Sequence, residues 1–128
     1  MARILIAEDD DSMRHFLGRA LLRAGHEVIA VGNGDDALTL VKESRFQLLL
    51  CDIVMPGLDG IELAKRAGQL DPDLKILFIT GFTAVAPHPV DGDRPMAHVL
   101  PKPFHLRELV EEVDRALGVA AEPGGAPA

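Results

Sequence analysis

The sequence predicts a doubly wound α/β fold, in which a five-stranded parallel sheet is covered by helices on both faces. Short apolar runs alternate along the chain with segments whose apolar residues recur every three or four positions. The runs lack the polar alternation of half-exposed strands, which is typical of a parallel sheet buried on both sides. A length of 128 residues suits one such domain.

The first half of the chain supplies three predicted strands and two predicted helices. The strands are expected over residues 3–7, 28–31 and 46–51. The first helix follows three good capping residues, Asp10, Asp11 and Ser12. Its apolar face recurs through Phe16 and Leu17, and Gly25 is expected to end it. Asp35 or Asp36 is expected to cap a second helix that runs to about residue 43.

The second half supplies two further strands and two helices. A third helix is expected over 61–69, a fourth strand over 74–79 and a fifth over 99–100, with or without His98. The last helix has an apolar stripe that predicts its buried face, Leu106, Leu109, Val110, Val113 and Leu117. Its acids, Glu108, Glu111 and Glu112, are expected to face water.

The fourth helix that the pattern requires is expected to be atypical or missing. It would fall within residues 82–95, which contain three prolines and a glycine. A proline inside a helix costs about 3 kcal/mol, so this segment disfavours a regular helix. Residues 1–118 are therefore expected to form the domain, and the small-residue segment 119–128 a disordered tail.

Composition excludes several classes of function. The chain has 13 Lys and Arg against 20 Asp and Glu, a formal charge of −7, which disfavours a nucleic-acid partner. A single cysteine cannot form an internal disulfide. We find neither a signal peptide nor an apolar stretch of about 18 residues, so no membrane association and a cytoplasmic location are expected.

Polar residues follow the predicted strands at the edge where such folds bind ligands. Glu8 and Asp9 follow the first strand, Asp52 the third, Thr80 closes the fourth, and Lys102 follows the fifth. Taken singly, the acids could be solvated loop or turn residues. Together, three carboxylates repel one another unless a cation neutralises them, and their hard oxygens suit Mg²⁺. A carboxylate held beside a metal, a lysine and a hydroxyl is a plausible phosphoryl acceptor.

Four segments resemble the signatures of response-regulator receiver domains, which are CheY-like. They are Ile4–Asp10, Cys51–Gly60, Ile79–Gly81 and Lys102–Phe104. The resemblance spans about residues 2–118 and implies a flavodoxin-like sheet with strand order 2-1-3-4-5. It also implies that Asp52 accepts a phosphoryl group from a histidine kinase or histidine phosphotransferase.

The resemblance further implies a role for each site residue. Asp9, Asp52 and the Val54 carbonyl would hold Mg²⁺, with Glu8 reaching it through water. The Thr80 hydroxyl and the Gly81 amide would hold phosphoryl oxygens, and Lys102 would pair with them. The Lys102–Pro103 bond would be cis.

More narrowly, segments such as Glu8–Arg14 and Pro103–Arg107 resemble the small stand-alone receivers of the CpdR kind. That resemblance implies an adaptor for the ClpXP protease that is fed by a phosphorelay and binds the protease when unphosphorylated. One departure concerns the switch, because Val99 stands where receivers usually have Tyr or Phe. An alternative switch is a reordering of residues 82–98 when Thr80 moves towards a phosphoryl group.

Other functions are compatible with some of the same residues. A CheY-like regulator of another target and a phosphorelay intermediate fit the same residues, as does a receiver-like binding protein without chemistry. A Mg²⁺-dependent aspartyl-phosphate phosphatase needs a proton-donating acid two residues after the nucleophile, where this chain has Val54. A flavodoxin would need a phosphate cradle in place of the acids at 8–11. We therefore expect a signalling protein and not an enzyme.

Overall fold

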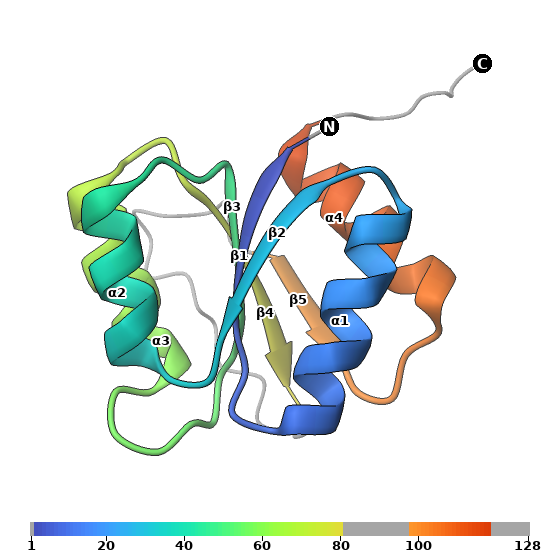
Figure 1. Ribbon diagram of the computed structural model, residues 1–128, viewed down its shortest axis with the longest axis horizontal. Coiled ribbons are helices and arrows are strands. Elements are labelled where there is room, and N and C mark those ends of the chain that lie inside the picture. Colours follow the sequence, from blue (N-terminus) through green and yellow to red (C-terminus); the bar gives the residue numbers. More distant parts are fainter. Residues whose placement is uncertain (1, 81–97, 119–128) are drawn as a thin grey trace.

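The structure, a computed structural model, describes residues 2–80 and 98–118. Within them the elements are β1 (Arg3–Ala7), α1 (Asp11–Arg23), β2 (Glu27–Val31), α2 (Gly34–Glu43), β3 (Leu48–Asp52), α3 (Gly60–Leu70), β4 (Lys75–Thr80), β5 (His98–Pro101) and α4 (Leu106–Leu117). All strand pairs are parallel, and the sheet order is β2-β1-β3-β4-β5 (Figure 1). The predicted fold and strand order are confirmed.

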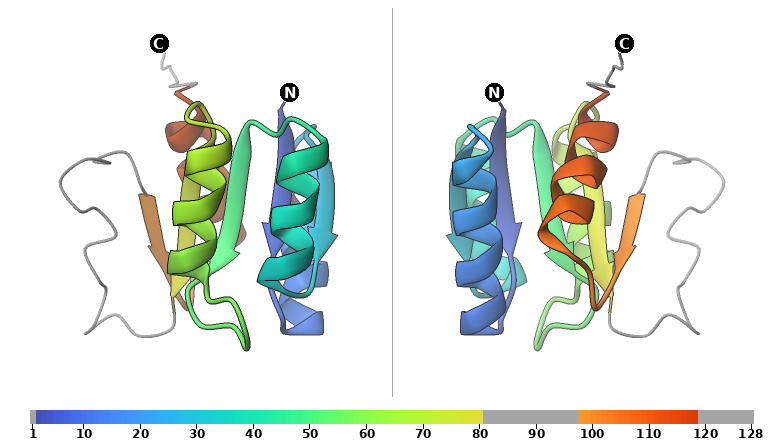
Figure 2. Two further views of the ribbon diagram at one scale, coloured as in Figure 1. Left: turned by 90° about the vertical axis from the view of Figure 1, so that its left-hand side faces the viewer. Right: turned by 90° about the vertical axis from the view of Figure 1, so that its right-hand side faces the viewer.

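Helices cover both faces of the sheet. Helices α1 and α4 pack on one face, and α2 and α3 pack on the other (Figure 2). Strand β1 shows how one strand serves both sides, since Ile4 and Ile6 join the first cluster and Leu5 and Ala7 the second. This alternation explains why apolar residues stand at consecutive positions within the strands.

Strands β3 and β4 begin later than predicted, because burial extends beyond strand pairing. Phe46 and Leu74 are buried, but each lies before its strand begins. The Arg3 guanidinium lies over the Phe46 ring, with Cζ of Arg3 4.8 Å from the ring centroid. Strands β3 and β4 instead extend to Asp52 and Thr80, which places two polar side chains on the strand ends themselves.

The helix caps show one confirmed prediction and one error. Asp10 caps α1 as expected, since its carboxylate accepts from the amides of Ser12 and Met13. Neither Asp35 nor Asp36 caps α2. The side chain of Asn33 does so by accepting from the Asp36 amide at 2.8 Å. Asn is as good a cap as Asp, so the helix begins earlier, at Gly34.

Two expectations about α4 are wrong. Leu106 is 44% exposed, and Ala116 is buried in the stripe instead. Glu112 does not face water, because its carboxylate lies 3.1 Å from Nδ1 of His98 on β5. The edge strand thus supplies this acid with a polar partner that helical periodicity alone does not reveal.

Several predictions lie outside the described residues. They are the atypical or missing fourth helix within 82–95 and the disordered tail over 119–128. The proposed switch segment, 82–98, also lies outside them except for its last residue. Within the described ranges, every helix is too short or too polar to cross a membrane.

Candidate functional site

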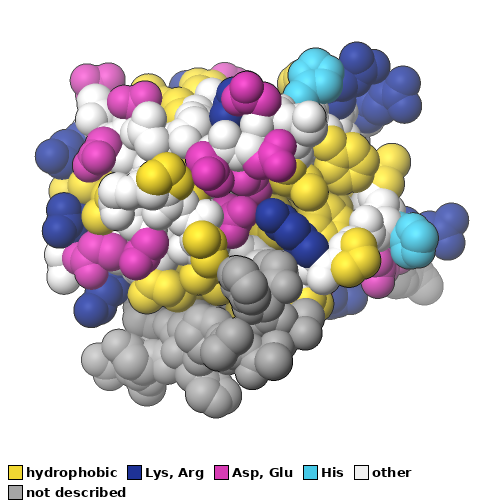
Figure 3. All heavy atoms as spheres, turned by 90° about the horizontal axis from the view of Figure 1, so that it is seen from below, with side chains coloured by type: hydrophobic (Ala, Val, Ile, Leu, Met, Phe, Trp, Pro, Cys, Tyr) yellow, Lys and Arg dark blue, Asp and Glu magenta, His cyan; other side chains and the backbone are white. Residues whose placement is uncertain are grey.

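The predicted site residues meet at the carboxyl edge of the sheet. Since β1, β3, β4 and β5 are successive neighbours, their ends bring together Glu8, Asp52, Thr80 and Lys102. Figure 3 views the molecule from this end and shows acidic side chains gathered beside a basic one. The topology therefore converts four distant sequence segments into one polar surface.

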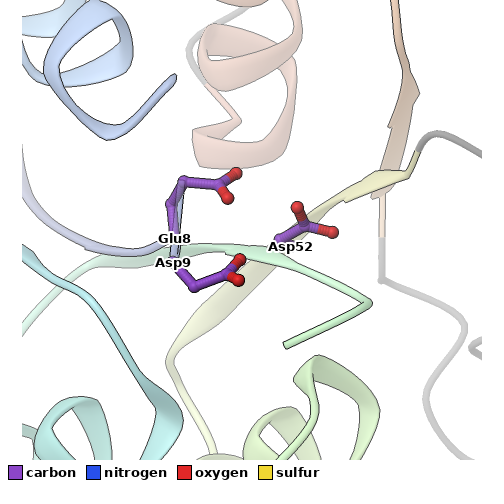
Figure 4. A group of neighbouring side chains, drawn as sticks. All are labelled: Glu8, Asp9 and Asp52. Atoms are coloured by element: carbon purple, nitrogen blue, oxygen red, sulfur yellow. The ribbon is translucent and has the colours of Figure 1, made fainter. Parts of the chain in front are cut away.

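Three carboxylates form the acidic part of the site. Glu8, Asp9 and Asp52 each offer an oxygen, and these oxygens lie within 4.8 Å of one another. Glu8 and Asp9 both extend toward the strand end that bears Asp52 (Figure 4). Glu8 is 1% and Asp52 6% exposed, whereas Asp9 is exposed. The trio is thus buried on one side and open to solvent at Asp9.

Lys102 supplies the positive charge of the site. Its Nζ lies 3.0 Å from Oδ2 of Asp52, to which it donates a hydrogen bond, and 3.8 Å from Oε1 of Glu8. Burial alone lowers the pKa of Lys102, but its hydrogen bond and charge contact with Asp52 outweigh burial and raise the pKa. The amine therefore stays protonated at neutral pH.

Glu8 is the acid that burial perturbs most clearly. Burial raises its pKa from 4.5 to about 7, with a further increase from the charge of Asp52, against the lowering effects of the Asp10 amide and Lys102. Its Oε2 accepts from the Asp10 amide at 3.1 Å. Among the described residues, its Oε1 is buried without a hydrogen-bond partner. That oxygen has coordinating capacity to spare.

The main chain around Asp52 holds its carboxylate in place. The Val54 amide donates to Oδ1 of Asp52 at 3.0 Å, so each carboxylate oxygen has a defined donor. A Cβ on Gly60 would lie only 2.1 Å from the Asp52 carbonyl oxygen, so only glycine fits there. The Asp-Gly pair that begins α3 therefore lets the helix approach the end of β3 closely.

Thr80 and Lys102 are joined through the main chain. The Lys102 amide donates to the Thr80 carbonyl at 2.7 Å, and the Thr80 side chain is buried at the end of β4. The Lys102–Pro103 peptide bond is cis, as the resemblance implied. Gly81, the expected second phosphoryl-binding residue, lies outside the described residues.

The model of one protein family matches most of the chain. Residues 4–114 match the response regulator receiver domain. The chain belongs to this family. CpdR of Brucella abortus, a response regulator receiver protein, is 58% identical over 118 residues, which cover 91% of this chain and 98% of that relative.

Solved receiver structures agree with the fold of this receiver. The receiver domain of the hybrid histidine kinase CckA superposes with a TM-score of 0.77 at 32% identity, covering 90% of this chain and 98% of that one. TrrA from Thermotoga maritima, a response regulator crystallised with Mg²⁺ and BeF, gives a TM-score of 0.79 at 28% identity. The match covers 91% of this chain and 99% of that one.

The acidic pocket of this receiver fits Mg²⁺, the ion that receivers bind there. Its donors are hard carboxylate oxygens, one of them Oε1 of Glu8, which has no hydrogen-bond partner among the described residues. Sequence reasoning missed the amides of Asp10 and Val54, which orient Glu8 and Asp52. Both contacts join an acid to the second residue after it, a spacing that is visible in the sequence.

Two neighbouring side chains complete the surroundings. Cys51 is fully buried in the cluster under α2 and α3, as expected, and burial raises the pKa of its thiol. Val99 on β5 packs against the same cluster. The position at which receivers usually have an aromatic ring is thus filled here by a small, half-buried side chain.

Proposed function

We propose that this receiver accepts a phosphoryl group on Asp52 in a Mg²⁺-dependent reaction and thereby switches its binding to a protein partner. The observation that supports this most directly is the 3.0 Å contact between Lys102 Nζ and Asp52 Oδ2 within the acidic trio. A protonated amine at that distance can neutralise a phosphoryl oxygen as charge develops on it.

The proposed step is a transfer from a histidine-phosphorylated kinase or phosphotransferase. A carboxylate oxygen of Asp52 attacks phosphorus and forms a P–O bond, while the P–N bond breaks and its electron pair remains on the histidine nitrogen. In the proposal, Lys102, the Thr80 hydroxyl and the Gly81 amide bind phosphoryl oxygens. Mg²⁺ would be held by Asp9, Asp52 and the Val54 carbonyl, with Glu8 bound through water, and when bound it supplies positive charge for the phosphoryl group.

We further propose that residues 1–118 act as a CpdR-like adaptor that controls ClpXP proteolysis in the cytoplasm. The 58% identity to CpdR, over 98% of that relative, supports this assignment. A CheY-like role toward another target, or a role as phosphorelay intermediate, is the alternative that partner binding must distinguish.

The site favours a signalling protein over an aspartyl-phosphate phosphatase. That class of enzyme needs a second acid two residues after the nucleophile. Val54 occupies this position, and its side chain is 54% exposed and has no proton to donate. The acyl phosphate on Asp52 is therefore expected to persist long enough to be read by a partner.

Labelling by acetyl phosphate tests the proposal. Intact-protein mass spectrometry should show one added phosphoryl group with Mg²⁺ and none with EDTA, and Asp52→Asn should remove it. Asp73→Asn, at an exposed carboxylate before β4, is the matched control and should label normally. Full labelling of Asp52→Asn would refute the assignment. Pull-down of ClpX with both phosphorylation states then tests the adaptor role.

A further inference from the structure

Arg14 on α1 reaches across to the end of β1. Its Nη1 donates to the main-chain carbonyl of Glu8 at 2.9 Å, and its Nη2 forms an ion pair with the Asp11 carboxylate. The amide of Glu8 donates in turn to the Val31 carbonyl at 3.1 Å. Glu8 is therefore held through both of its main-chain polar groups at the point where β1 enters the acidic pocket.

The end of β2 leaves space for this guanidinium. A Cβ on Gly32 would lie 3.2 Å from Nη1 of Arg14, closer than side chains normally pack. The Arg14 side chain is only 27% exposed. Its position is thus fixed by the Glu8 carbonyl and the Asp11 carboxylate, and the glycine after β2 leaves room for it.

The carbonyl that Arg14 binds belongs to the peptide group that joins Glu8 and Asp9. The orientation of this peptide group sets the directions in which both carboxylates leave the main chain. Among the described residues, Arg14 donates to the Glu8 carbonyl and to Asp11, and Asp11 is outside the acidic trio. Arg14 can therefore orient Glu8 and Asp9 without a direct contact to the carboxylates that would bind the metal.

We propose that Arg14 is a positioning residue that sets the Mg²⁺ affinity of the acidic pocket by fixing the peptide group between Glu8 and Asp9. This inference rests on the proposed function. Arginine suits the task because its planar fork presents donors to two acceptors at once, whereas lysine has a single nitrogen. Groups that orient metal ligands typically change affinity about 10- to 100-fold when they are removed.

The test compares four variants of the full chain by calorimetric titration with MgCl₂. We expect Arg14→Met and Arg14→Lys to bind Mg²⁺ roughly 10-fold more weakly than the wild type. Gly32→Ala changes no charge and should weaken binding to a smaller extent by displacing the guanidinium. Arg19→Met, on the same helix, is the matched control and should bind as the wild type does.

Acetyl phosphate labelling gives a second readout. Arg14→Met should need more Mg²⁺ for half-maximal labelling, whereas the rate at saturating Mg²⁺ should stay near that of the wild type. Wild-type affinity in Arg14→Met would overturn the inference. Wild-type Mg²⁺ affinity in Arg14→Lys would also overturn the inference, because a positive charge alone would then be enough to maintain that affinity.

Two outcomes separate this inference from its premises. If Arg14→Met does not fold, as judged by circular dichroism, Gly32→Ala decides, and unchanged affinity in that variant overturns the inference. If the wild type itself neither binds Mg²⁺ nor becomes labelled, the proposed function fails and the role of Arg14 in it is refuted as well.

Discussion

The buried Glu8 carboxyl group should make the stability of the metal-free protein depend on pH. Burial raises the pKa of Glu8 from 4.5 to about 7 in the folded state. The folded protein then binds this proton more tightly than the unfolded chain does. The free energy of unfolding should therefore fall as pH rises from about 4.5 to about 7, and level off above that.

Glu8→Gln removes this dependence, because glutamine is neutral and similar in shape to the protonated acid. A pKa that rises from 4.5 to about 7 corresponds to about 3 kcal/mol, at about 1.4 kcal/mol per pKa unit. We expect the variant and the wild type to be about equally stable near pH 5. Near pH 8 the variant should be more stable by up to about 3 kcal/mol.

Urea unfolding followed by circular dichroism measures the effect, since the chain has neither Trp nor Tyr for fluorescence. The measurement is made in EDTA, and Mg²⁺ should restore stability to the wild type near pH 8, because it binds the folded state. Glu111→Gln, at an exposed position of α4, is the control. A stability difference between Glu8→Gln and the wild type that does not change from pH 5 to pH 8 would refute the reasoning.

Four other substitutions test the site and the packing. Lys102→Met removes the cation from Asp52, and we expect pull-down to lose its response to phosphorylation while the melting temperature changes little. Gly60→Ala places a Cβ 2.1 Å from the Asp52 carbonyl oxygen and should cost about 1–3 kcal/mol in thermal unfolding. Gly18→Ala, where the added Cβ meets open space, should stabilise the folded protein by up to about 1 kcal/mol. Equal effects of the two substitutions would contradict the close contact at Gly60. Leu109→Ala, at a fully buried position of α4, should lower the free energy of unfolding in urea by about 2–5 kcal/mol.

The parallel sheet was predictable because its strands contain apolar runs, whereas the strand order followed from the resemblance to receiver domains. The strand boundaries were less predictable, because an apolar residue indicates burial and not strand pairing. Phe46 and Leu74 are buried outside their strands for this reason. Glu112 shows a second limit, because its partner His98 lies on a strand that helical periodicity does not include.

The convergence of Glu8, Asp52 and Lys102 was also predictable, because parallel topology places successive strand ends side by side. The electrostatics of the site could not be read from the sequence. The raised pKa of Glu8 depends on its burial, and the orientation of Asp52 depends on the Val54 amide. The two-residue spacing between Asp52 and Val54 is visible in the sequence, but the burial of Glu8 and the direction of that amide require the folded structure.

Asp52 and Lys102 anchor to parts of the sheet with unequal support. Asp52 ends β3, the middle strand of five, all of whose residues are buried, whereas Lys102 follows the outermost strand β5. A strand that is hydrogen-bonded to neighbours on both sides is displaced less easily than an edge strand with one neighbour. A rearrangement triggered at this ion pair should therefore move Lys102 and the end of β5, whereas Asp52 and β3 stay in place. The signal would then be transmitted through the edge of the sheet.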